Sequence, residues 1–289
     1  MKFLIRHQTL YHYANEVSLC HNQSCLLPRQ MSWQQCQHST LQIEPYPSPL
    51  VERHDFFGNR IHYFSLQTPH HSLSVTAQST VNVAAPEPYP ATPPWEQVRS
   101  ALYQDFSTEG LRARALALSS PLVGLNPTFN EYAYDSFAPG RPFLDAVQDL
   151  THRIYQDFTY DPHFTTVITP LSEVFEHRRG VCQDFAHFAL ACLRGMGLAA
   201  RYVSGYLETL PPPGQPKLQG ADASHAWLSV YLPEQGWFDF DPTNDQPRTE
   251  QYITIGWGRD YGDITPVKGI LYGGGDHKLE VSVDVERIT

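Results

Sequence analysis

Residues 178–193 read RRGVCQDFAHFALACL and predict the helix around which the rest of the chain is organised. Apolar residues recur with the spacing i, i+3, i+4, i+7, i+8 and i+11, which is typical of one buried helical face. They are Phe185, Phe188, Ala189, Cys192, Leu193 and Met196. Gly180 is expected to open the helix, and Gly195 and Gly197 are expected to end it.

Cys182 is expected in the first turn of this helix. Backbone N–H groups without partners and the positive end of the helix dipole favour a thiolate over a thiol at that position. The thiolate is the nucleophilic form of cysteine. The sequence therefore predicts a reactive cysteine at position 182, whereas Cys192 lies on the apolar face and is expected to be buried.

The composition limits the class of protein. The chain has 289 residues, which favours two domains, and its 41% hydrophobic and 17% charged residues are ordinary for a folded soluble protein. A formal net charge of −10 argues against nucleic acid or an anionic membrane as a partner. The apolar run near Met1 is too short for a signal peptide, and five cysteines without framework spacing favour a reducing compartment. The expected location is cytoplasmic.

The first 84 residues predict strands, because polar and apolar residues alternate and no long helical period occurs. Residues 73–83 are rich in β-branched side chains, and Gly58 followed by Asn59 indicates a hairpin. We expect residues 1–84 to form an antiparallel β-sandwich. Residues 84–94 contain five prolines, so residues 85–94 are expected to be an extended, stiff connector.

Residues 95–289 are expected to form a second domain in which helices precede strands. Trp95, Val98, Leu102 and Phe106 share one stripe of the first helix. The expected helices cover 95–121, the segment after Pro142, and 169–175; the expected strands are 200–207, 225–232, 237–241 and 278–288. The last of these strands could pair with either domain.

The two strands 225–232 and 237–241 are expected to form a hairpin, whose register decides which side chains meet. If Tyr231 pairs with Trp237, Asp241 lies opposite Trp227 and diagonal to His225 on the same face. A register shifted by one residue would place Asp241 on the other face.

With the first register, a carboxylate orients the imidazole of His225, which faces Cys182 at the start of the helix. A nucleophile, a base and an orienting group are the parts of a thiol acyl transferase or hydrolase. Asp239 shares the face of Asp241 and is the rival orienting carboxylate. It lies nearer the hairpin turn.

Three motifs resemble the signatures of the transglutaminase-like superfamily: GVCQDFAH at 180–187, SHAW at 224–227 and GWFDFDPTN at 236–244. More narrowly, the chain is similar to bacterial transglutaminase-like cysteine proteases, whose N-terminal β-domain resembles residues 1–84. This resemblance implies an α+β fold with a papain-like catalytic domain after the β-sandwich. It also implies a triad of Cys182 as nucleophile, His225 as base and Asp241 as orienting acid.

Further site residues are less fixed by the sequence. The backbone N–H of Cys182 is the simplest oxyanion donor, and Gln183, Tyr160 and Trp227 are candidates for the second. Trp227 and Trp237 could line a substrate groove, although two large aromatic residues on a hairpin more often belong to the core.

The expected function is acyl transfer from an amide through a thioester, with peptide or isopeptide hydrolysis as the first choice. The partner is then a peptide or protein amide; a transamidase and a catalytically silent scaffold are the alternatives. Nothing in the sequence marks a calcium site, and this chemistry needs no cofactor. A metal site of Cys182, His187 and Cys192 is not expected, because positions five residues apart lie about 140° apart around a helix. His187 is expected to be a structural hydrogen-bonding residue.

Overall fold

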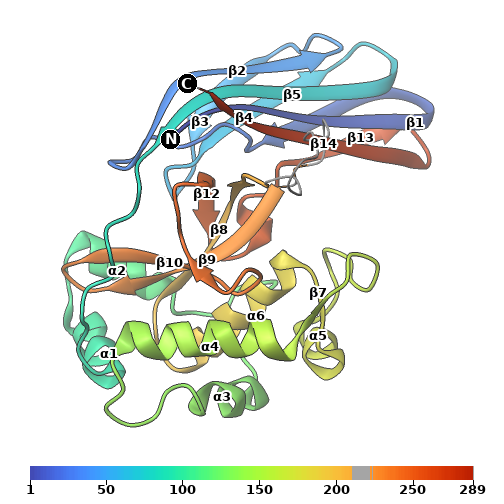
Figure 1. Ribbon diagram of the computed structural model, residues 1–289. Coiled ribbons are helices and arrows are strands. Elements are labelled where there is room, and N and C mark those ends of the chain that lie inside the picture. The colour runs from blue at the N-terminus through green and yellow to red at the C-terminus, as the bar shows by residue number, and fades with distance from the viewer. Residues whose placement is uncertain (210–221, 223, 289) are drawn as a thin grey trace, which may run out of the picture.

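The computed structural model describes residues 1–209, 222 and 224–288, and it arranges them as two antiparallel sheets and a layer of helices (Figure 1). The first sheet lies at one end of the molecule, the second sheet lies in the middle, and the helices cover the far side of the second sheet. The chain is thus of the expected α+β class.

The first sheet is built on one very long strand, β1 (Lys2–Ser24), which pairs with four others. Its first half lies between β5 and β14, and its last residues lie between β4 and β13. The remaining strands of the sheet are β2 (Gln34–Glu44), β3 (Leu50–His54), β4 (Arg60–Leu66), β5 (His70–Val83), β13 (Val267–Gly273) and β14 (His277–Ile288). The expected β-sandwich is therefore a single, curled antiparallel sheet.

The last two strands of the chain belong to this first sheet. Residues 277–288 of β14 pair with residues 2–13 of β1, so the structure selects the N-terminal sheet from the two partners left open for the final strand. The domain limits at residues 84 and 94 stay a prediction. The pairing of β13 with β1 shows that the chain returns to the first sheet at Val267.

The second sheet has the strand order β11–β10–β9–β8–β12. Its strands are β8 (Ala200–Leu207), β9 (Ser224–Leu232), β10 (Gly236–Asp241), β11 (Gln246–Pro247) and β12 (Tyr252–Gly258). The helices are α1 (Trp95–Gln104), α2 (Thr108–Ala115), α3 (Pro127–Tyr134), α4 (Phe143–Asp157), α5 (Leu171–His177) and α6 (Cys182–Gly195), with a 3₁₀ turn η1 (Tyr261–Asp263). A short parallel pair, β6 (Thr159–Tyr160) and β7 (Arg179–Gly180), precedes α6.

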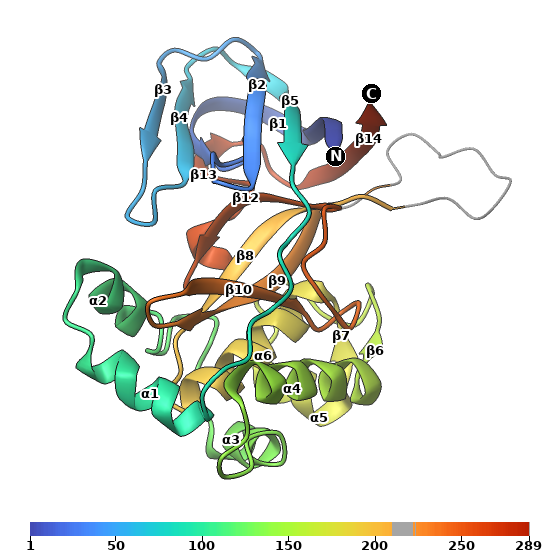
Figure 2. The same ribbon diagram turned by 60° about the vertical axis from the view of Figure 1, so that its left-hand side comes forward.

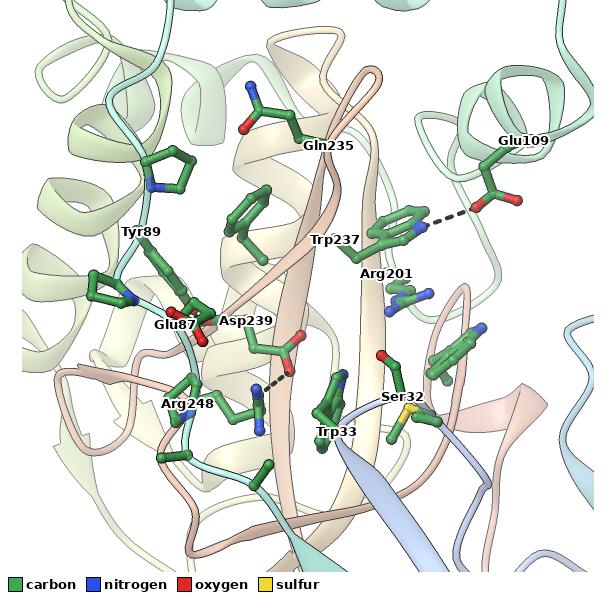
Figure 3. A pocket seen from close by; sticks show the side chains of 18 residues that line it. Ser32, Trp33, Glu87, Tyr89, Glu109, Arg201, Gln235, Trp237, Asp239 and Arg248 are labelled. Atoms are coloured by element: carbon green, nitrogen blue, oxygen red, sulfur yellow. Dashed lines mark hydrogen bonds and ion pairs between the residues drawn. The ribbon is translucent and has the colours of Figure 1, made fainter.

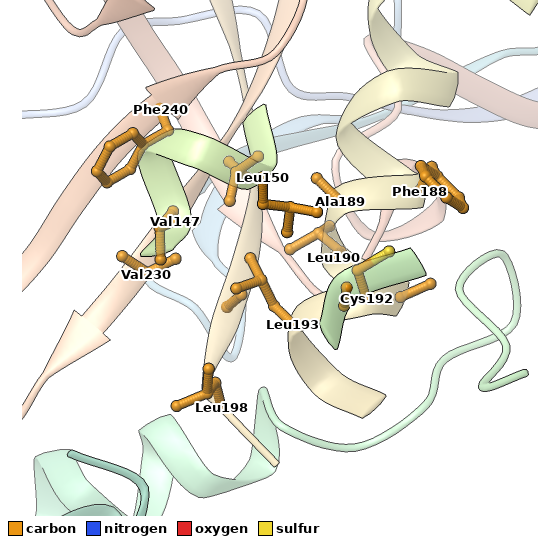
Figure 4. Close-up of a cluster of buried hydrophobic side chains, with 14 of the residues drawn as sticks. Val147, Leu150, Phe188, Ala189, Leu190, Cys192, Leu193, Leu198, Val230 and Phe240 are labelled. Carbon is orange, nitrogen blue, oxygen red and sulfur yellow. The ribbon is translucent and has the colours of Figure 1, made fainter. Parts of the chain in front are cut away.

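The core between the helices and the second sheet is formed by α6, which packs against α3, α4 and one face of that sheet. Figure 4 shows Leu150 of α4, Leu190 and Leu193 of α6, and Val230 of β9 in this cluster. Residues 184–194 are all buried, so the helix is covered on every side and not on one stripe alone. Cys192 is buried as expected.

The structure corrects the expected helix at 95–121. The chain breaks after α1, because the side chain of Ser107 accepts a hydrogen bond from the Gly110 N–H and thereby caps a new helix, α2. Phe106 lies in the break and is 76% exposed, so it does not belong to the apolar stripe. Helix α3 was not predicted; Asn126 caps it and Pro127 occupies its first turn.

Residues 84–93 form the extended segment expected from the prolines and pass in front of the second sheet from β5 to α1 (Figure 2). Tyr89 anchors the segment: its hydroxyl donates to the backbone oxygen of Asp239, and its ring packs edge-on against Phe238 and Phe240. The connector is therefore held against β10 at Tyr89.

The first sheet docks on β12, the edge strand of the second sheet. The side-chain amide of Gln34 pairs with the backbone of Thr254, donating at 2.7 Å and accepting at 2.8 Å. Asn59 pairs in the same way with the backbone of Trp257, at 2.8 and 3.0 Å. Two amide side chains thus satisfy backbone groups that an edge strand would otherwise expose.

Replacing Gln34 by alanine should destabilise the protein by about 1–3 kcal/mol, because the N–H of Thr254 would lose its buried partner and its C=O would keep only the Arg29 N–H. Urea unfolding measures the effect. Gln42→Ala, on the same strand but exposed, is the matched control and should change the free energy of unfolding by less than about 0.5 kcal/mol. Equal effects of the two substitutions would contradict this account of the docking.

Candidate active site

The position of Cys182 is fixed by the turn that precedes α6. The buried carboxylate of Asp184 accepts hydrogen bonds from the Val181 N–H at 2.8 Å and from the Thr165 hydroxyl at 2.6 Å. A Cβ on Gly180 would lie 2.7 Å from that carboxylate, so the close approach requires glycine. Cys182 is consequently held in the first helical turn, where it is half-buried.

The hairpin has the register that the site requires. Trp237 pairs with Tyr231, and Asp239 pairs with Ser229, which places Asp241 on the face of His225. His225 Nε2 and Asp241 Oδ2 are 2.7 Å apart. The expected register is confirmed, and with it the contact between the imidazole and the carboxylate.

Asp241 is 1% exposed, and every hydrogen bond around it stabilises its ionised form. Besides His225, Oδ2 accepts from the Tyr252 hydroxyl and from Asn244 Nδ2, each at 2.7 Å. Oδ1 accepts from the backbone N–H of Thr243 at 2.8 Å. Burial alone raises the pKa of Asp241, but the charge of His225 and these hydrogen bonds outweigh it and lower the pKa below its usual range.

His225 is almost enclosed and carries a strongly shifted pKa. Burial lowers the pKa of the imidazole, but the charge and hydrogen bond of Asp241, together with the interaction with Cys182, raise it to about 10. The ring therefore carries a proton on both nitrogens at neutral pH. Trp227 stacks on it with 6.0 Å between ring centroids, which limits the orientations of the imidazole.

The structure separates the two tryptophans named from the sequence. The prediction that Trp227 lines a substrate groove is wrong, because its side chain is fully buried between His225 and Tyr252. These two rings and the strands on both sides of β9 leave the indole no route to solvent. Trp237 lines a pocket that contains none of Cys182, His225 and Asp241.

Two of the three candidates for the second oxyanion donor, Tyr160 and Gln183, lie in segments next to Cys182, and the third, Trp227, is the fully buried ring described above. Tyr160 of β6 pairs with Gly180, and burial together with the charge of Cys182 raises the pKa of its hydroxyl, which places it near the thiol. Gln183 lines a different pocket of about 350 Å³, between residues 121–126 and residues 167–172, the last two of which begin α5. These positions do not test an oxyanion role for Tyr160, Gln183 or Trp227, and all three roles stay predictions.

Several groups at the site were missed from the sequence. Asn244 is the last residue of the motif GWFDFDPTN, and its position three residues after Asp241 could have indicated a contact between the two side chains. Tyr252 comes from β12 and had no local signal. Asp184 follows Val181 by three residues, the spacing of a capping interaction. His187 has the expected structural role, since its Nε2 accepts from the Tyr261 N–H at 3.1 Å.

Comparisons with known proteins agree with this architecture. A model of the bacterial transglutaminase-like N-terminal region matches residues 3–82, and a model of the transglutaminase-like superfamily matches residues 131–242. An uncharacterized protein of Mycobacterium tuberculosis is 42% identical over 295 residues, which cover 98% of this chain and 92% of that protein.

A solved structure from Cytophaga hutchinsonii, described as a "putative cysteine protease", superposes with a TM-score of 0.76 at 20% identity, covering 100% of this chain and 92% of that one. A protein-glutamine gamma-glutamyltransferase of Pseudomonas aeruginosa is 34% identical over 104 residues, 33% of this chain and 16% of that protein.

Fold and site together define a two-part α+β protein with a cysteine at a helix start beside a His–Asp pair. The chain belongs to the transglutaminase-like superfamily and carries the N-terminal region of its bacterial members. Among the helices of residues 1–209 and 224–288, none is long and apolar enough to cross a membrane.

Asp241→Asn should lower the pH at which the His225 ring loses its proton, because the carboxylate raises the pKa of His225 to about 10. Ring ¹⁵N NMR over pH 5–11 measures this. Since the folded-state pKa lies above 6.5, the pair stabilises the fold at neutral pH, and that contribution is lost as the pH rises through about 10. Asp245→Asn, on the exposed His152 pair, should leave the His225 curve unchanged.

Proposed function

We propose that this protein transfers the acyl group of an amide to the thiol of Cys182 and then to water, as a peptidase or isopeptidase. The observation that carries the proposal is the buried His225–Asp241 pair, 2.7 Å apart, whose imidazole interacts with a cysteine in the first turn of α6. A thiolate is stabilised by an adjacent imidazolium and by a helix N-terminus.

In the first step, the sulfur of Cys182 attacks the amide carbon and forms a C–S bond. The imidazolium of His225 gives its proton to the amide nitrogen, the C–N bond breaks and the amine leaves. In this proposal the backbone N–H of Cys182, in the first turn of α6, stabilises the developing oxyanion.

In the second step, the neutral imidazole of His225 accepts a proton from water. The hydroxide oxygen attacks the thioester, the C–S bond breaks and the carboxylic acid is released. Asp241 keeps the ring oriented and stabilises its charged form throughout, which the hydrogen bonds from Tyr252 and Asn244 support.

Transamidation is the second candidate. It differs only in the acceptor: an amine attacks the thioester in place of water. The partial similarity to a protein-glutamine gamma-glutamyltransferase supports it, over 104 residues. Hydrolysis remains the first choice of reaction. The expected compartment is the cytoplasm, and the free state of all five cysteines supports this expectation of a reducing compartment.

Iodoacetamide at neutral pH should alkylate Cys182 at least tenfold faster than Cys36, which is also half-buried, and far faster than buried Cys192. Peptide mapping by mass spectrometry gives the individual rates. His225→Asn should remove the advantage of Cys182. If Cys182 reacts no faster than Cys36, an activated cysteine is absent and the proposal fails.

With a mixture of peptide amides, Cys182→Ala should reduce turnover by roughly 10⁴-fold or more, and Cys36→Ala should have no effect. The products are analysed by mass spectrometry with and without a primary amine such as cadaverine at about 10 mM, a concentration above typical KM values. The comparison shows whether water or the amine is the acceptor of the acyl group. Free acid in both samples supports hydrolysis. Amine adducts as the main product would show the transamidase instead.

A further inference from the structure

A pocket of about 860 Å³ lies between the first sheet, the connector and the second sheet (Figure 3). Its walls come from Trp33 in the loop before β2, from residues 84–90 and from β10. Asp239 and Arg201 in its floor lie on the same face of the second sheet as His225. Ser229 of β9 pairs with both Asp239 and Arg201. The fully buried ring of Trp227 lies between Ser229 and His225, so the pocket is separate from the cysteine site.

Arg201 is the central observation. Its guanidinium is stacked between two indole rings, 4.1 Å from the centroid of Trp237 and 3.7 Å from that of Trp257, and the residue is only 8% exposed. In the part of the chain that the structure describes, this guanidinium forms no hydrogen bond and no ion pair, and its Nε is buried without a partner. A buried cation without an acceptor is costly, so the arrangement points to an acceptor that a ligand supplies.

Arg248 repeats the pattern on the opposite side of Asp239 (Figure 3). Its guanidinium stacks on Trp33 at 3.7 Å, its side chain is 9% exposed, and its Nη1 is buried with no partner among the described residues. Its Nε lies 3.7 Å from Asp239 Oδ2, a long ion pair that leaves the rest of the fork available. Two arginine forks thus line one pocket with unused donors.

The acidic residues of the pocket limit the charge of the ligand. Asp239 is engaged by the Ser229 hydroxyl and by Arg248, and Glu109 accepts from Trp237 Nε1 at 3.2 Å. Glu87 also lines the pocket. The three carboxylates repel any anion, and they repel a dianion such as phosphate about twice as strongly as a monoanion, so only a singly charged ligand is compatible with the two guanidiniums. Burial lowers the pKa of Arg201 to about 9, so this residue stays charged at neutral pH.

The remaining walls are flat and aromatic, formed by Trp33, Trp237, Trp257 and Tyr89. Such surfaces bind planar or aliphatic groups, and an arginine fork matches a carboxylate in two parallel hydrogen bonds. We propose that this pocket binds a monocarboxylate with an aromatic or aliphatic body, held by Arg201 and Arg248. A free organic acid and the C-terminal carboxylate of a peptide share this chemistry.

Isothermal titration calorimetry on the full chain tests the proposal with four probes: phenylacetate as a free acid, N-acetylphenylalanine as a peptide end, N-acetylphenylalanine amide, and inorganic phosphate. We expect at least one carboxylate to bind tenfold or more tightly than the neutral amide and than phosphate. The stronger of the two carboxylates identifies the source. Equal binding of acid and amide, preferred binding of phosphate, or no binding at millimolar concentration would overturn the proposal.

Arg201→Gln should weaken the binding of that carboxylate at least tenfold, and Arg112→Gln, at an exposed position of α2 outside the pocket, should not change it. Because Arg201 is buried, thermal unfolding must first show that the variant is folded. Ser32→Trp, at an exposed position of the rim, is the second variant: it narrows the pocket with both arginines intact and should also weaken binding. Unchanged affinity in the folded variants would assign the ligand to another place.

Discussion

The ionised carboxylate of Asp241 is the group on which the candidate site depends, because a buried charge is stable only while its partners remain in place. Its partners come from three separate segments: His225 of β9, the turn at Thr243 and Asn244, and Tyr252 of β12. The position of the imidazole is thus determined by strands on both sides of β9. A displacement of β12 would remove the Tyr252 hydroxyl from this carboxylate.

The first sheet contributes to the candidate site through β12. That strand is an edge of the second sheet, and its outer backbone groups are paired with Gln34 and Asn59 of the first sheet. Arg29 adds a contact of 3.6 Å over the ring of Trp257 and donates to Asn59. The N-terminal region therefore fixes the strand that supplies Tyr252, and its packing is coupled to the geometry around His225.

How well the sequence predicted each feature depends on how far apart in the sequence the interacting residues lie. The start of α6 and the hairpin register were predictable, because helical periodicity and a five-residue connection are local properties. The pairing of β14 with β1 joins the two ends of the chain, and alternation alone could not choose between two sheets. Tyr252 and the arginine stack depend on contacts between distant strands. Trp227 was misjudged because a strand pattern gives a face but not what covers it.

The two ends of this sheet face differ in how their buried charges are balanced. At one end, Asp241 and His225 neutralise each other, and four further hydrogen bonds complete the carboxylate. At the other end, the guanidinium of Arg201 has aromatic neighbours on both faces and no acceptor among the described residues at its edge. Indole faces attract a cation but leave its N–H donors unused. In the proposed reaction, the complete network would preserve the geometry of the reacting groups, whereas in the proposed binding pocket the unused donors would retain binding energy for a molecule that supplies the acceptor.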